Sequence, residues 1–144
     1  MPHAHLRFEN PPALPHADVV EILNNALADR SVEPSAAEAL VGIALNDDDR
    51  EFIERCCLDV GTRAVSGSPL LGLAGLCLGH TARRFGYLSD EAVGLAELLA
   101  ARADAHPFDV DGRALDGRDD IRWYLRDQVK QDPSGDVGAG DDLA

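Results

Sequence analysis

The segment LLGLAGLCLGHTARRFG, residues 70–86, constrains the fold of this chain more than any other. Its first nine residues are apolar or small on almost every side of a helix, which is typical of a central helix covered by several neighbours. Gly72, Gly75 and Gly79 share one stripe, and each costs about 0.5–1 kcal/mol relative to alanine inside a helix. Close packing of another helix against this stripe has to return that free energy. The segment therefore predicts a packed helical protein.

Signals for helix starts recur along the rest of the chain. A capping box, in which a polar side chain and a Glu three residues later satisfy backbone N–H groups, begins at Asp18, Ser35 and Asp48. Other capping patterns predict starts at Ser68, Ser89 and Asp109. Apolar residues recur at helical spacing after these starts, and no stretch alternates convincingly as a strand. The sequence predicts an all-α fold class.

Short connections between the predicted helices indicate their arrangement. They force neighbouring helices to run antiparallel, so six helices group into three hairpins, 17–45, 48–85 and 89–126. The second helices begin near residues 35, 69 and 109, which are 34 and 40 residues apart. This spacing suits an α-solenoid, a stack of helical hairpins. We expect an extended N-terminal arm over 1–16, a helical domain over 17–127 and a disordered acidic tail over 128–144.

The charge of the chain restricts the kinds of partner that it can bind. The formal net charge is −13, and five aspartates and Lys130 beyond residue 126 contribute only −4 of it. The helical part is therefore acidic, and it should repel nucleic acid and acidic membranes. There is no apolar run that could span a bilayer and no pattern of a signal peptide. We expect a cytoplasmic protein, monomeric before it binds a partner.

Cys77 and His80, three residues apart on the central helix, raise the question of a metal site. Cys56 or Cys57 could lie opposite them, but vicinal cysteines point about 100° apart and the chain has no Cys-x-x-Cys pair. Buried thiols beside a histidine are the favoured interpretation. The chain also lacks a P-loop, a dinucleotide fingerprint and a nucleophile elbow. We expect no catalytic residues, no metal and no cofactor, and an enzyme using Cys77 and His80 stays a third alternative.

Two stretches of the chain resemble small bacterial proteins of the HEAT-repeat-like class. They are LLGLAGLCLGHTARRFG and, downstream, LLAARADAHPFDVDGRALDGRDDIRWYL. The resemblance covers residues 69–126 and, more loosely, 35–65, where LNDDDREFIERCCLDVG places Arg55 as Arg113 is placed later. The sequence departs from the pattern at Thr81, where a hydrophobic residue is usual, and at Gly117, where alanine is expected. Many such proteins are immunity proteins, which neutralise a toxin encoded beside them by tight binding.

The resemblance implies a protein-binding function and supplies no catalytic residues. An immunity protein against a nuclease toxin can fill the toxin's basic cleft with acidic groups that mimic phosphates. Helical spacing gathers the candidate partner-binding residues Asp116, Asp119, Asp120 and Trp123, with Tyr124 adjoining. A second acidic candidate is the pair Asp47 and Asp48, which turn and capping roles explain equally well. Trp123 or Tyr124 could instead close the core, and the runner-up function is an adaptor without a toxin partner.

Overall fold

The computed structural model describes residues 11–131, which form seven α-helices and one short 3₁₀ helix with no strand. This confirms the all-α prediction for the described residues. The elements are α2 (His16–Ala28), η1 (Arg30–Val32), α3 (Glu33–Asn46), α4 (Arg50–Arg63), α5 (Pro69–Phe85), α6 (Asp90–Ala105), α7 (Arg113–Tyr124) and α8 (Arg126–Gln131). The sequence did not predict η1 or α8.

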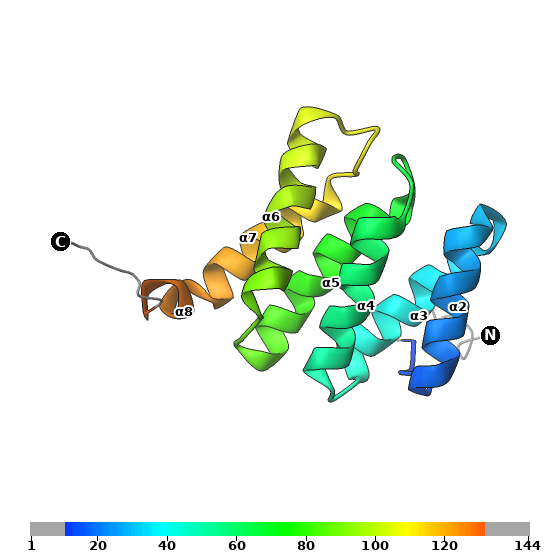
Figure 1. Ribbon diagram of the computed structural model, residues 1–144. Coiled ribbons are helices and arrows are strands. Elements are labelled where there is room, and N and C mark those ends of the chain that lie inside the picture. The colour runs from blue at the N-terminus through cyan, green and yellow to red at the C-terminus, as the bar shows by residue number, and fades with distance from the viewer. Residues whose placement is uncertain (1–10, 132–144) are drawn as a thin grey trace, which may run out of the picture.

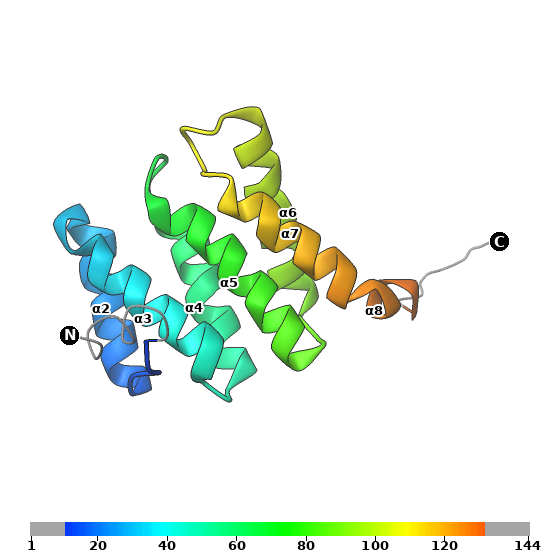
Figure 2. The same ribbon diagram turned by 180° about the vertical axis from the view of Figure 1, so that it is seen from behind.

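The helices lie in two layers that alternate along the chain. Figure 1 shows α2, α4 and α6 side by side in front, and Figure 2 shows α3, α5 and α7 side by side on the other face. The helix α5 contacts α3, α4, α6 and α7, and its contact with α7 is the most extensive. The apolar segment that opens α5 is buried as the sequence predicted. The helix α5 is therefore the central helix of the described residues.

Glycines explain why α5 and α7 pack so closely. A Cβ atom added to Gly75 would lie 3.1 Å from the Cα of Ala114, and one added to Gly79 would lie 2.9 Å from the Cα of Gly117. A Cβ added to Gly117 would overlap the carbonyl oxygen of Gly75. The predicted close approach along the glycine stripe is confirmed. Gly117 departs from the expected alanine because the backbone of α5 occupies the space of its side chain.

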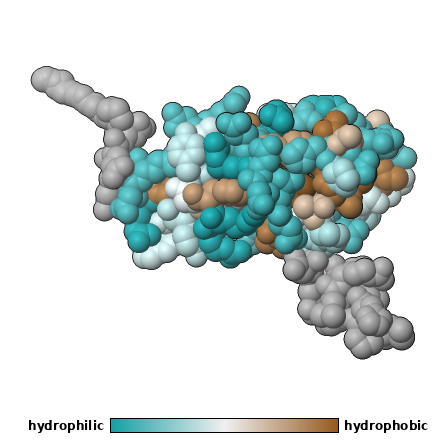
Figure 3. All heavy atoms as spheres, turned by 90° about the horizontal axis from the view of Figure 1, so that it is seen from below, coloured by the Kyte–Doolittle hydropathy of each residue, from teal (hydrophilic) through white to brown (hydrophobic). Residues whose placement is uncertain are grey.

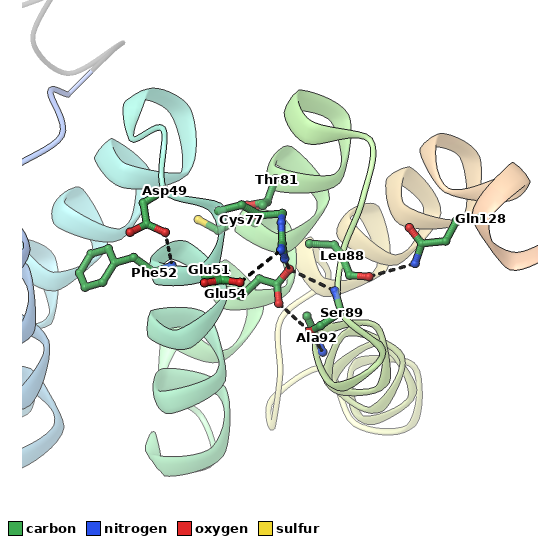
Figure 4. A network of polar contacts seen from close by, with 11 residues as sticks. Asp49, Glu51, Phe52, Glu54, Cys77, Thr81, Leu88, Ser89, Ala92 and Gln128 are labelled. Carbon is green, nitrogen blue, oxygen red and sulfur yellow. Dashed lines mark hydrogen bonds and ion pairs between the residues drawn. The ribbon is translucent and has the colours of Figure 1, made fainter. Parts of the chain in front are cut away.

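Two buried carboxylates join helices that are not neighbours in the sequence. Glu33 on α3 accepts a 2.7 Å hydrogen bond from Ser68 Oγ, and Glu54 on α4 accepts a 2.6 Å bond from Ser89 Oγ. Ser68 and Ser89 are the N-caps of α5 and α6. Each glutamate thus holds the serine that caps a helix 35 residues further on. Glu54 also accepts from Ser89 N and from Arg50, a network shown in Figure 4.

Substitution of Glu54 tests how much this network stabilises the fold. We expect Glu54→Ala to lower the free energy of unfolding by about 2–4 kcal/mol, because it leaves Arg50 and the Ser89 hydroxyl without their carboxylate. The neighbouring Glu51 is a matched control: its side chain is exposed and 3.9 Å from Arg50. Glu51→Ala should change the free energy by less than about 0.5 kcal/mol. Urea unfolding measures both, and equal effects would contradict a special role for Glu54.

The helix starts agree with the sequence at two positions and differ at four. Ser68 and Ser89 cap α5 and α6 as predicted, with side chains that accept from Leu70 N and Ala92 N. The cap of α4 is Asp49 rather than Asp48. The starts predicted at Asp18, Ser35 and Asp109 are wrong, because α2, α3 and α7 begin at His16, Glu33 and Arg113. The N-cap residues of α2 and α3 are Pro15 and Val32, and neither makes a side-chain cap hydrogen bond.

Asp109 does not cap a helix because stronger partners hold its carboxylate. Arg102 donates two hydrogen bonds to it, at 2.7 and 2.8 Å, and Ser66 Oγ donates a third at 2.6 Å. The backbone N–H of Gly67 donates to the Asp109 carbonyl at 2.8 Å. The bonds from Ser66 and Gly67 fasten the α6–α7 loop to the α4–α5 loop, and the charge-assisted bonds from Arg102 fasten the same loop to α6. The bonds from Arg102 and Ser66 lower the pKa of Asp109 to about 2.

The lowered pKa of Asp109 predicts a pH-dependent stability. Because its folded-state pKa lies below the ordinary 3.8, the ionised carboxylate contributes stability above about pH 4 and loses that contribution as the pH falls towards 2. Melting temperatures of the wild type and Asp109→Asn should therefore differ at pH 5 and converge near pH 2. Asp104 is exposed and makes no ion pair within residues 11–131, so Asp104→Asn is the control. A difference that stays constant from pH 5 to 2 would contradict this role of Asp109.

The ends of the helical domain differ from the sequence-based boundaries. Residues 11–15 precede α2 and lie against α3, where the Pro11 carbonyl accepts a 2.7 Å bond from Asn46 Nδ2 and Leu14 packs on the core. These five residues of the predicted N-terminal arm are therefore packed against the helical domain. At the other end, α8 continues to Gln131, so the boundary predicted at 128 falls inside a helix. Residues 1–10 and 132–144, the rest of the predicted arm and tail, lie outside the described residues.

Candidate functional site

The helix α7 presents three of the predicted site residues on one side. Asp116, Asp120 and Trp123 are spaced by four and three residues, which places them in line along a helix. The opposite side of α7 is held in the protein by Ala114, Gly117 and Ile121, the buried residues of the helix. Because the close contact at Gly75, Gly79 and Gly117 fixes the backbone of α7 against α5, this outward line of side chains has a rigid support. We call these three residues the α7 stripe.

The charged members of the α7 stripe have no ion-pair partner within residues 11–131. Asp116 is exposed, and Asp120 is half-buried, with its Cβ close to Gly79 of α5. Asp119 is exposed on the same side of α7, but it accepts hydrogen bonds of 3.0 and 3.2 Å from the neighbouring Arg118. Its negative charge is therefore partly neutralised inside the chain. Of the three predicted aspartates, Asp116 and Asp120 are the two whose charges remain available to a partner.

Both predicted aromatic residues lie on the surface. Trp123 is 59% exposed and Tyr124 is 41% exposed, whereas Ile121 and Leu125 fill the core at this end of α7. The alternative that Trp123 or Tyr124 closes the core is therefore wrong. The guanidinium of Arg126 lies 3.9 Å from the centroid of the Trp123 ring and restricts its movement. A large aromatic ring held in an exposed position is typical of an anchor in a protein interface.

The two residues of the second acidic candidate, Asp47 and Asp48, have different surroundings. The Asp47 side chain is only 10% exposed, because it accepts bonds of 2.8 Å from His16 Nε2 and from Asp49 N. Asp47 is thus a turn residue whose carboxylate is already occupied. Asp48 is fully exposed and 3.6 Å from Arg84. In a view from below, where the α3–α4 loop lies, the described surface is mostly hydrophilic with separate apolar patches (Figure 3).

His80 lies next to the α7 stripe on the facing helix. Burial is the main cause that lowers the pKa of His80; the nearby Arg83 lowers it further, and Asp120 acts in the opposite direction. The imidazole is therefore neutral at pH 7 and does not cancel the charge of Asp120. Its Nδ1 atom is buried and has no hydrogen-bond partner in the structure. This histidine leaves the negative charge of the α7 stripe intact.

The cysteines offer neither a reactive thiol nor a metal site within the described residues. All three are buried, and burial raises the pKa of Cys56 and of Cys77 to about 12 and that of Cys57 well above its usual range. The thiols are therefore protonated at neutral pH. In residues 11–131, no three His, Cys, Asp or Glu side chains come together in a way that could hold a metal ion. Cys77 is a buried residue of the packed core.

A hollow of the described surface lies between α2 and α4, away from α7. Its volume is about 500 Å³, and Leu23, Phe52 and Cys56 form part of its lining. The thiol of Cys56, protonated at neutral pH, is a poor nucleophile there. The hollow has the character of a shallow apolar groove between two packed helices.

No helix within residues 11–131 combines the length and the apolar character needed to cross a membrane. Comparison of the chain with protein-family models, with curated proteins and with solved structures found no match. The function has to be inferred from the residues and their geometry. On that basis the α7 stripe, two unpaired carboxylates and an exposed aromatic ring on a rigid helix, is the best candidate for a binding site.

Proposed function

We propose that this chain is an immunity protein that binds a cognate toxin domain and neutralises it, and that the toxin is a basic nuclease. The observation that carries the proposal is the α7 stripe of Asp116, Asp120 and Trp123 on an acidic chain. Carboxylates four residues apart on a helix are separated by about 6 Å along its axis. Such a row of negative charges can occupy a cleft that binds the phosphates of a nucleic acid.

The charge of the whole chain supports the same kind of partner. A net charge of −13 speeds association with a basic protein and weakens association with nucleic acids or acidic proteins. Trp123 adds apolar contact area at the end of the charged row, where it can determine how long the complex lasts. The aspartates thus guide the encounter, and the aromatic ring holds the partner once it has docked.

The arrangement of helices in two layers supports the fold that we propose for this function. We infer that α2–α3, α4–α5 and α6–α7 are three stacked hairpins of a HEAT-like solenoid. In such a stack each pair contacts its neighbours, and the surface formed by successive helices is extended and rigid. The α7 stripe lies on the last of these pairs. A rigid support reduces the entropy lost on binding and so favours a tight complex.

Co-purification with the product of the adjacent gene tests the proposed function. The tagged chain and this product are expressed together, purified at low salt and separated by size, and we expect a stoichiometric complex that weakens as salt is raised. A complex with a product that is harmless when expressed alone would favour the adaptor instead. Failure to form any complex would contradict the immunity function and favour the adaptor, whose partner need not be the product of the adjacent gene.

A further inference from the structure

The outward side of α6 carries a row of apolar residues between acidic ones. Gly94, Leu98, Ala101 and Ala105 are all exposed and spaced by four, three and four residues, so they share one side of the helix. Leu98 is 55% exposed. A Cβ atom at Gly94 would meet no atom within 4 Å, so nothing within the described residues accounts for a glycine inside this helix. Gly94 costs the helix about 0.5–1 kcal/mol relative to alanine, and the open space beside it lets another molecule approach the backbone closely.

A fully exposed phenylalanine follows this face. Phe108 is 96% exposed, three residues beyond Ala105. The loop that carries it is fixed, because the adjacent Asp109 bonds to Arg102 and Ser66 and the Gly67 N–H donates to its carbonyl. The ring is therefore presented to solvent by a rigid loop rather than by a loose one. An aromatic ring in this position loses little conformational entropy when a partner covers it.

Acidic residues border the apolar face of α6. Asp90, Glu97 and Asp104 recur at intervals of seven residues and form one flank of the helix. Glu97 is bound to Arg122 of α7 at 2.8 Å, whereas Asp90 and Asp104 make no ion pair within residues 11–131. A second copy of this chain, packed antiparallel on α6, would bring like charges together along this flank. The border instead complements an apolar segment with basic residues at its edge.

We propose that the α6 face, defined as Leu98, Ala101, Ala105 and Phe108 with Asp90 and Asp104 at its border, is a second docking surface for the toxin. This inference rests on the proposed function. Its occupant is an apolar segment of the toxin with Lys or Arg at its edge, of which Leu98 and Phe108 are the principal contacts. The toxin then binds the last helix pair at two places, the α7 stripe and the α6 face.

Binding of the purified product of the adjacent gene to surface variants tests this inference. Leu98→Glu and Phe108→Ala should each weaken the complex about tenfold or more, because each removes an exposed apolar contact. Val20 on α2 is 44% exposed and provides the matched control Val20→Glu, which should bind as the wild type does. Circular dichroism verifies that Leu98→Glu folds. Phe108→Ala changes a side chain with almost no contacts, so it keeps the test valid even if Leu98→Glu does not fold.

The outcomes separate the two proposals. Weakening by both variants with an unchanged control supports the second docking surface. Wild-type affinity in Leu98→Glu and Phe108→Ala, or an equal loss in Val20→Glu, overturns the second docking surface and leaves the proposed function standing. If the wild-type chain itself does not bind, the proposed function fails and this inference fails with it.

Discussion

Replacement of Gly117 by alanine should lower the free energy of unfolding by at least about 2–3 kcal/mol. The added Cβ would overlap the carbonyl oxygen of Gly75, which is backbone in the middle of α5 and cannot rotate away. The two helices would have to separate along their whole seam, and overpacking of this kind typically costs about 1–3 kcal/mol or more. Urea unfolding of the purified variant measures the effect. A second measurement, the melting temperature, should fall in parallel.

The matched control for this substitution is Gly94→Ala, the same change in another helix interior. Because a Cβ at Gly94 meets open space, this variant should gain about 0.5–1 kcal/mol from the higher helix propensity of alanine. The two substitutions thus have opposite expected signs. If Gly117→Ala unfolds at the same urea concentration as the wild type, α5 and α7 do not pack as closely as described.

Charge reversal on the α7 stripe should weaken the toxin complex by about 100-fold. The double variant Asp116→Lys and Asp120→Lys replaces two carboxylates that have no ion-pair partner within residues 11–131 with two cations. Each cation would face the basic partner, and close charge pairs across an interface contribute about 1.5 kcal/mol or more. Stopped-flow binding should show much of the loss as slower association at low salt.

A second double variant controls for the change in net charge. Asp18 and Glu21 are exposed on α2, at the far end of the helical domain from α7, and their reversal to lysine changes the net charge by the same amount. This control should slow association only slightly, because long-range charge effects are weaker than contacts. Equal losses in both double variants would mean that net charge, and not the α7 stripe, governs binding.

The sequence predicted the parts of the fold that depend on local patterns. The stripe of Gly72, Gly75 and Gly79 indicated a close helix contact, and α7 provides it. Ser68 and Ser89 indicated helix starts because each stands next to Pro69 or to acidic residues, and both are caps. These features involve neighbouring residues only. Local patterns of the same kind at Asp18, Ser35 and Asp48 did not mark the caps, which are Pro15, Val32 and Asp49.

The sequence could not predict features that depend on distant partners. Asp109 is a residue type that often caps helices, but its carboxylate is hydrogen-bonded to Arg102 and Ser66 instead. Neither partner could be identified from local spacing. Glu54 interrupts the apolar face of α4 between Ile53 and Cys56, which is a signal of a buried acid, yet its partner Ser89 lies 35 residues away. Contacts between distant parts of the chain therefore decide whether a polar residue caps a helix or binds another side chain.

The candidate site was predicted in part. Helical spacing gathered Asp116, Asp119, Asp120 and Trp123, and the structure shows that all four reach the surface to different degrees. The occupation of Asp47 by His16, which lies 31 residues earlier, could not be read from the sequence. The α6 face was missed because Leu98 adjoins the buried Leu99, so the pattern of the core concealed a second apolar side.

Growth of bacteria that express the product of the adjacent gene tests the central claim most directly. In this measurement the toxin candidate is induced alone, with the wild-type chain, or with the Asp116→Lys and Asp120→Lys variant. We expect the product alone to stop growth, the wild-type chain to restore it and the variant to restore it poorly. A product that is harmless alone, or one whose toxicity the wild-type chain does not relieve, would contradict the account.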